Sequence, residues 1–282
     1  MDLFSVNSNM GAQIALESLA STTSQLTSAQ KQISTGYRVA DATDDGAAYA
    51  VAQRVRSDVS TLTTANQQIG MAGSLVSTTL TSLNDVSNTL LSVRSTMTEL
   101  ADSGLDTQSR SQYTAQLKEL VKQVSSYLQD SSYNGKSLIG DIGGQTITGL
   151  VMVRNEVGTT YGVSTWSGNS HVATSLAAAT SSSLTAGYFQ TALGTSGMMT
   201  NVANNVGTAL NNFGSISNYL NNQVSYNSDK IDSLNNGLGT LVDANLAQES
   251  AQLQALQIKQ QLATQSLSLA NQAPSILLKL FQ

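Results

Sequence analysis

The 282-residue sequence has no cysteine, one proline and one histidine, and few of its residues carry charge. Without cysteine, the chain has neither disulfide bonds nor thiolate metal ligands. Charged residues make up 11% of the sequence, against about 25% in typical soluble domains. So few charges provide little electrostatic repulsion between identical copies. We therefore expect self-association, with disorder as the competing interpretation.

The charge balance and the hydropathy pattern argue against two classes of partner. A formal net charge of −5 and a pI near 4.7 do not suit nucleic acid, which requires a clustered basic surface. No apolar stretch approaches the roughly 18 residues of a membrane span, so we expect no membrane contact. The first residues, 1–4, lack the basic segment and the apolar run of a signal peptide. Export is then expected to proceed without a cleavable signal.

The scarcity of reactive side chains argues against catalysis. His171 is the only histidine, and no carboxylate stands at metal-ligand spacing from it. The sequence also lacks the GxSxG, P-loop and dinucleotide-binding fingerprints. We therefore expect no enzymatic activity, no catalytic residue, no cofactor and no metal site.

What the sequence does contain is a long seven-residue repeat. Its apolar members are Val55, Leu62, Ile69, Val76, Leu83, Leu90 and Met97. Val59 and Leu80 fill some of the complementary positions, and the others are interrupted by Asn66, Gly73, Ser87 and Arg94. A strict repeat of this length predicts long helices in a left-handed supercoil.

Two more amphipathic helices share this spacing. After a break near Gly104, the apolar positions are Tyr113, Leu117, Leu120, Val124 and Tyr127. The short connection predicts that this helix runs antiparallel to the one before it. Late in the chain the apolar positions are Val206, Leu210, Phe213, Leu220, Val224, Ile231, Leu234, Leu238 and Leu241, with Ser217 and Asn227 as polar members. The three patterns predict one bundle, whose rod seam we assign to the seven-residue repeat together with Leu220, Ile231, Leu234 and Leu238.

The segment between these helices, residues 133–200, has a different character. Asn134-Gly135 and Gly143-Gly144 are turn dipeptides beside short apolar runs, which indicates hairpins. Residues 146–154 and 159–166 are predicted strands. Residues 170–197 are rich in Ala, Ser, Thr and Gly without a clear period. We expect a small β-rich or irregular insertion here.

The two ends of the chain carry amphipathic helical patterns that need a partner. The assembly core is predicted to contain Leu16, Leu19, Leu26 and Ile33 near the N-terminus and Leu246, Leu253, Leu256, Leu262 and Leu269 near the C-terminus. Each helix is amphipathic, and neither could fold alone in water without a partner face. Thr43 or Asp44 is expected to cap the long helix that follows, and Pro274 to separate the last helix from the apolar tail 276–281. The fold class is therefore mainly α: a long, coiled-coil-like helical bundle built from both chain ends, with a small central insertion.

Short motifs at both ends resemble bacterial flagellin. At the N-terminal end they are residues 32–39, QISTGYRV, and residues 42–48, ATDDGAA. At the C-terminal end they are residues 242–251, VDANLAQESA, residues 257–261, QIKQQ, and residues 270–274, ANQAP. The resemblance covers about the first 140 and the last 80 residues, whereas the central insertion matches nothing. Two signatures in the right order at opposite ends make the resemblance highly specific.

The resemblance implies a structural subunit that polymerises into the flagellar filament. In that family the termini, here 1–42 and 243–282, pair as a coiled-coil core. The long helices, here 43–132 and 201–242, form a second layer, and an insertion such as 133–200 faces outward. Partners implied are further copies of the chain, the flagellar cap and hook-associated proteins, and the type III export apparatus with its chaperone. The subunit would then be extracellular.

Many flagellins activate an innate immune receptor through a helix motif that this sequence has largely lost. Residues 90–96 read LLSVRST where the motif reads LQRVREL, so Leu90, Val93 and Arg94 are its remnant. We expect weak or no receptor activation. Two alternatives to a filament subunit remain open from the sequence: the hook–filament junction protein, and a type III secreted translocator or adhesin with coiled-coil ends.

Overall fold

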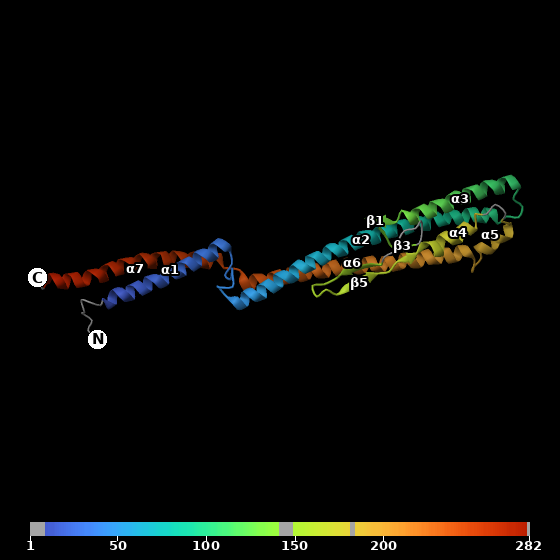
Figure 1. Ribbon diagram of the computed structural model, residues 1–282. Coiled ribbons are helices and arrows are strands. Elements are labelled where there is room, and N and C mark those ends of the chain that lie inside the picture. The colour runs from blue at the N-terminus through green and yellow to red at the C-terminus, as the bar shows by residue number, and fades with distance from the viewer. Residues whose placement is uncertain (1–8, 141–148, 181–183, 281–282) are drawn as a thin grey trace. The chain divides into compact units, whose positions relative to one another are not determined.

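The computed structural model describes residues 9–140, 149–180 and 184–280, with side chains described as far as residue 272. The chain is mainly α, with a small strand-containing central region (Figure 1). The long helices are α1 (Met10–Thr35), α2 (Gly46–Leu100), α3 (Thr107–Gln129), α6 (Met198–Val242) and α7 (Leu246–Leu280). The described residues divide into two compact units: one lies within residues 59–231, and the other lies within residues 1–58 and 232–282.

The core of the 59–231 unit is a single apolar cluster. Side chains of α2, α3 and α6 contribute to it, as predicted for the three amphipathic patterns, and side chains of the central region complete it. Arg110 donates from Nη1 to the Leu100 carbonyl and from Nη2 to the Asp102 carbonyl, at 2.9 and 2.7 Å, which holds the turn between α2 and α3. Figure 1 shows α3 folding back along α2, antiparallel as expected. Asp106 caps α3 by accepting from the amides of Gln108 and Ser109.

Within α2 the buried face is wider than the predicted seam. The six repeat residues from Leu62 to Met97 are buried, and Val55 is half-buried. The complementary stripe, however, was assigned wrongly. The fully buried partners lie three residues after the repeat, at Ala65, Ala72, Thr79, Val86, Val93 and Leu100. The predicted positions four residues after it are half-buried or, for Arg94, exposed. Small side chains such as Ala and Thr let helices approach closely, but a search for large apolar residues passes over them.

The buried polar member of the α6 seam holds the central region to the helices. Asn227 is fully buried and donates from Nδ2 to Asn66 Oδ1 at 2.8 Å and to the Arg154 carbonyl at 3.0 Å. Tyr219 of α6 stacks on Tyr161 with ring centroids 4.3 Å apart. A buried amide left without these partners would cost about 1–3 kcal/mol. The polar interruption in the repeat therefore has a structural role, in the docking of the strands on α6.

The described strands form three two-stranded pairs. β1 (Ser132–Tyr133) pairs antiparallel with β2 (Lys136–Ser137), and β4 (Leu150–Val153) with β5 (Thr160–Val163). β3 (Ile139–Gly140) and β6 (Trp166–Ser167) pair in parallel. The first pair confirms the hairpin predicted at Asn134-Gly135. The second pair lies within the predicted strands 146–154 and 159–166, whereas Gly143-Gly144 lies outside the described residues.

The end of the central region is helical where we expected no regular structure. It contains a π-helical turn η1 (Asn169–Ala173) and the helices α4 (Thr174–Ala178) and α5 (Ala186–Leu193). Val172, Leu176, Phe189 and Ala192 are buried in the common core. Because so few large apolar residues face the core, the sequence shows no helical period. Tertiary packing, not local pattern, decides the conformation.

The C-terminal helix also differs from the prediction. α7 runs from Leu246 to Leu280 without a break at Pro274. Proline removes one backbone hydrogen bond from a helix interior but does not always end the helix. The expectation that Pro274 separates the tail from the preceding helix is therefore wrong.

Candidate assembly surface

The terminal helices α1 and α7 pair antiparallel within the 1–58 and 232–282 unit. Asn9, which caps α1, donates from Nδ2 to the Ala270 carbonyl at 2.7 Å. At the other end of α1, the amide of Gln32, with its nitrogen turned toward Glu249, donates to both carboxylate oxygens at 3.1 and 3.0 Å. These contacts set the register: the start of α1 lies beside the end of α7 (Figure 1).

The facing side chains of the pair follow a coiled-coil spacing of alternating threes and fours. The covered positions of α1 are Ala12, Ala15, Leu19, Thr22, Leu26, Ala29 and Ile33, and those of α7 are Glu249, Leu253, Leu256, Gln260, Ala263, Leu267 and Ala270. Thr22, Ala29 and Leu256 are buried, and the others are half-buried. Five of the predicted assembly residues, Leu19, Leu26, Ile33, Leu253 and Leu256, therefore lie in this intrachain seam.

The remaining predicted assembly residues point away from the seam. Leu16, Leu246, Leu262 and Leu269 are 56%, 49%, 58% and 63% exposed. Ile258, which the sequence reading left out, is 59% exposed and shares a helical face with Leu262 and Leu269. At 100° per residue this face is turned roughly 140° from the face that meets α1. We call Ile258, Leu262 and Leu269 the outer stripe of α7.

The surroundings of the outer stripe are almost uncharged. Between residues 250 and 272, Lys259 is the only charged residue. The remaining exposed positions carry Gln, Ser, Thr, Asn and Ala. On such a surface, few charges repel a second copy of the chain that packs against the apolar stripe. This face can pack against another helix without burying unpaired charge.

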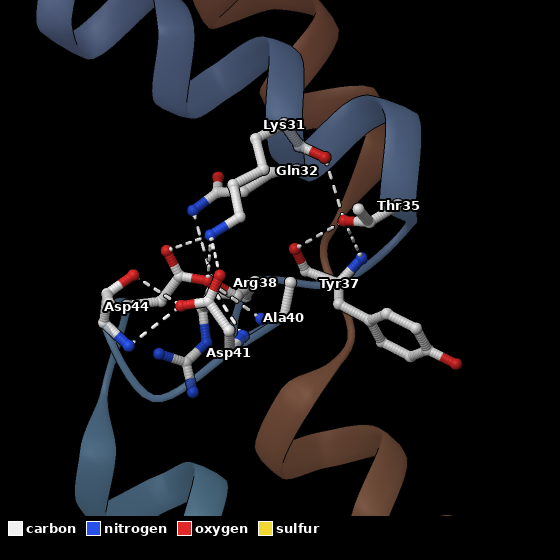
Figure 2. A network of polar contacts seen from close by, with 9 residues as sticks. Lys31, Gln32, Thr35, Tyr37, Arg38, Ala40, Asp41 and Asp44 are labelled. Atoms are coloured by element: carbon white, nitrogen blue, oxygen red, sulfur yellow. Dashed lines mark hydrogen bonds and ion pairs between the residues drawn. The ribbon is translucent and has the colours of Figure 1, made fainter.

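Residues 36–45, which we call the joint, connect α1 to α2. Lys31, in the last turns of α1, binds two carboxylates of this joint (Figure 2). Lys31 Nζ lies 2.7 Å from Asp41 Oδ2 and 2.8 Å from both carboxylate oxygens of Asp44. Asp44 Oδ2 also accepts from the amides of Ala40 and Asp41, at 3.0 and 3.2 Å. The connection is thus wound around two carboxylates and one ammonium group.

The ionisation of these groups reflects the hydrogen bonds between them. The Lys31 ammonium holds the pKa of Asp41 well below its usual range, assisted by the hydroxyl and amide of Thr43. Lys31 likewise lowers the pKa of Asp44. Hydrogen bonds to Asp41 and Asp44 raise the pKa of Lys31. All three groups are therefore charged at neutral pH.

The cap of α2 is a residue that we did not predict. Asp45 Oδ1 accepts from the amides of Ala47 and Ala48 at 3.1 and 3.0 Å. Asp44 is engaged with Lys31, and Thr43 donates from both its amide and its hydroxyl to Asp41 Oδ1. The prediction of Thr43 or Asp44 as the cap is therefore wrong. Three consecutive residues all have capping chemistry, and only the path of the loop selects among them.

The same joint brings the N-terminal and C-terminal motifs together. The Arg38 amide donates to the Val242 carbonyl at 2.7 Å, and the Ala244 amide to the Gly36 carbonyl at 2.9 Å. The Arg38 guanidinium donates from Nη2 to the Leu241 carbonyl at 2.6 Å. Below them lies a small buried apolar cluster of Val39, Ala48, Ala52 and Val242. Motifs 32–39 and 242–251, about 200 residues apart, thus form one hydrogen-bonded element.

The helical regions at both ends of the chain match one protein family. Residues 6–143 match the bacterial flagellin N-terminal helical region, and residues 196–281 match the bacterial flagellin C-terminal helical region. The chain belongs to the bacterial flagellin family. Flagellin FljM of Caulobacter vibrioides is 32% identical across the full length of both chains, and the flagellin of Brucella melitensis is 29% identical over 99% of both. A solved structure of Bacillus cereus flagellin matches more distantly, at 14% identity and a TM-score of 0.37 over 66% of this chain and 94% of that one. The family assignment therefore rests on the sequence matches.

This flagellin is a structural subunit of the bacterial flagellar filament, an extracellular organelle of motility. The matches at both ends do not favour the junction protein, translocator or adhesin alternatives. No helix in the described ranges has a stretch apolar enough to cross a bilayer.

The other predicted site residues of this flagellin lie inside the 59–231 unit or close to the joint. Leu220 is buried, whereas Ile231, Leu234 and Leu238 are half-buried. Of the receptor-motif remnant, Leu90 and Val93 are buried and Arg94 is exposed. Weak or absent receptor activation stays a prediction.

Proposed function

We propose that this flagellin polymerises by packing the outer stripe of α7 against terminal helices of neighbouring copies. The observation that carries the proposal is the exposure of Ile258, Leu262 and Leu269 on one face of a nearly uncharged helix already paired on its other face. Burying each of these half-exposed side chains contributes about 1–2 kcal/mol. Leu16 and Leu246 add exposed apolar surface to the same unit.

The proposal couples folding of the terminal helices to association. A single α1–α7 pair buries few side chains, so its ordering entropy is only partly offset in the monomer. Contacts with neighbouring copies offset the remaining entropy cost, because anything that binds only the folded form stabilises it. Assembly and completion of the terminal fold then occur together.

The layering proposed for the filament follows the family resemblance. Residues 1–42 and 243–282 form its inner core, residues 43–132 and 201–242 the surrounding layer, and residues 133–200 the outer surface. The proposed partners are further copies, the flagellar cap and hook-associated proteins, and the type III export apparatus with its chaperone. The uncharged surface of α7 supports placement in the core, since such a surface is suited to burial.

The test is polymerisation of the full chain on filament seeds or with a precipitating salt, followed by electron microscopy. The variant with Ile258→Ser and Leu262→Ser is expected to keep the helical circular dichroism of the monomer and to form no filaments. Val157→Ser is the matched control, because Val157 is 78% exposed and lies in a turn of the other unit. That control should polymerise normally.

Two further outcomes complete the test. A chain lacking about 45 residues at each end should stay monomeric under the same conditions. Normal filaments from the double serine variant would exclude the outer stripe as the contact. Loss of filaments from Val157→Ser as well would mean that any loss of exposed apolar surface prevents assembly.

A further inference from the structure

The tip of the β1–β2 hairpin carries an asparagine–glycine pair in an exposed two-residue turn. Asn134 and Gly135 both have positive φ, at 50° and 73°, and both are exposed. They link Tyr133 and Lys136, which are opposite each other in the hairpin. Apart from Gly135 itself and its two chain neighbours, no atom lies within 4 Å of where a Gly135 side chain would begin. The space beside Gly135 is therefore open to solvent, and no neighbouring group blocks the approach of the Asn134 side chain to the Gly135 nitrogen.

We propose that Asn134 is a site of spontaneous deamidation. The backbone nitrogen of Gly135 attacks the side-chain carbonyl carbon of Asn134 and forms a five-membered succinimide. Its proton leaves with the side-chain amide, which departs as ammonia. Water then opens the ring at either carbonyl and yields aspartate or isoaspartate. Water is the only co-reactant, and glycine offers no side chain to hinder the attack.

The local structure favours this reaction because the turn opens at low cost. β1 and β2 have only two residues each, and an isolated hairpin is marginally stable. Ser131 and Ser137 anchor its base, where the Ser137 hydroxyl donates to the Ser131 carbonyl at 3.1 Å. The exposed tip beyond them belongs to the kind of surface turn whose opening free energy is small. Opening frees the Gly135 nitrogen to reach the Asn134 side chain.

The chain contains its own control in a second asparagine–glycine pair. Asn236 and Gly237 are exposed as well, but they lie inside α6. There the helix ladder engages the Gly237 amide in a hydrogen bond and fixes the backbone angles. The two sites share the same chemistry and a similar exposure, and they differ in backbone constraint. Asn134 should therefore react and Asn236 should not.

The reaction would change the surface around the turn. Asn134 and Lys136 line a groove of about 340 Å³ together with Met71, Leu75 and Val151. Deamidation places a carboxylate on the lining of this apolar groove, which Lys136 also lines. Isoaspartate also adds a methylene group to the main chain, which the two-residue turn cannot accommodate without rearranging.

The experiment incubates the full-length protein at mildly alkaline pH and follows both peptides by mass spectrometry, with isoaspartate detected by enzymatic methyl labelling. In the folded protein, Asn134 is expected to deamidate at least about tenfold faster than Asn236. In urea, both should react at similar rates, which shows that both are chemically competent. Asn134→Gln should remove the signal from its peptide. An unreacted Asn134 in the folded protein, or equal rates at both sites there, would overturn the proposal.

Discussion

At the scale of single residues, Lys31 organises the joint between α1 and α2. Its ammonium contacts Asp41 and Asp44, whose pKa values it lowers. A carboxylate with a depressed folded pKa stabilises the fold above its unfolded pKa, and this contribution is lost as pH falls through the folded value. Lys31 has a raised pKa, so its contribution is present below its unfolded pKa and is lost as pH rises through the folded one.

We therefore expect Asp44→Asn to reduce the thermal stability of the terminal unit at neutral pH. The variant should also lose less stability than the wild type when the pH falls below about 4. The reason is that Asp44, one of the two carboxylates that contact Lys31, is already neutral in the variant. Circular dichroism melts at several pH values measure both effects. Glu17→Gln, at an exposed position of α1, is the control. An unchanged melting temperature in Asp44→Asn would show that the ion pairs at the joint contribute nothing measurable.

At the scale of elements, the buried face of α2 explains why the seven-residue repeat is needed. Val76 is fully buried in the common core. Val76→Asp would place an unpaired charge there at a cost of several kcal/mol. We expect urea unfolding at a much lower denaturant concentration and no filament formation. The neighbouring Ser77→Asp, on the exposed face, should be close to wild type. Equal midpoints for the two variants would contradict the assigned seam.

At the scale of the whole chain, the two compact units differ in how much they bury. Among the described residues of α1 and α7, only Thr22, Ala29 and Leu256 are buried. The other unit has a core drawn from α2, α3, α5 and α6. Terminal helices with so small a core should open readily in the monomer.

Limited trypsin digestion of the monomer should therefore cut at Lys31, Arg38 and Lys259 before it cuts at Lys118 or Lys122 in α3. Filaments should protect the terminal sites, because the proposed assembly covers them. Fragment masses over a time course give the order of cleavage. Early cuts in α3 would mean that the 59–231 unit is the less stable part.

Local patterns in the sequence predicted much of this protein. The seven-residue repeat predicted a long α2, and Asn134-Gly135 predicted a hairpin, because each depends on residues close together in the chain. Leu19, Leu26 and Leu256 were correctly placed in terminal helices, and the end motifs indicated the family. Helical period alone, however, did not separate the face of α7 that meets α1 from the outer stripe, so Ile258 was missed.

Other features depend on contacts that no local pattern records. The Ala65 and Ala72 stripe, the short helices of the central region and the choice of Asp45 as cap were settled by packing and by the path of the loop. The hydrogen bonds between Arg38 and Val242 likewise join motifs from opposite ends of the chain. The sequence by itself thus determined the helices, the hairpin and the family, because periodicity and turn chemistry act over short distances. Tertiary structure alone decided which small residues are buried and which apolar face of α7 remains exposed.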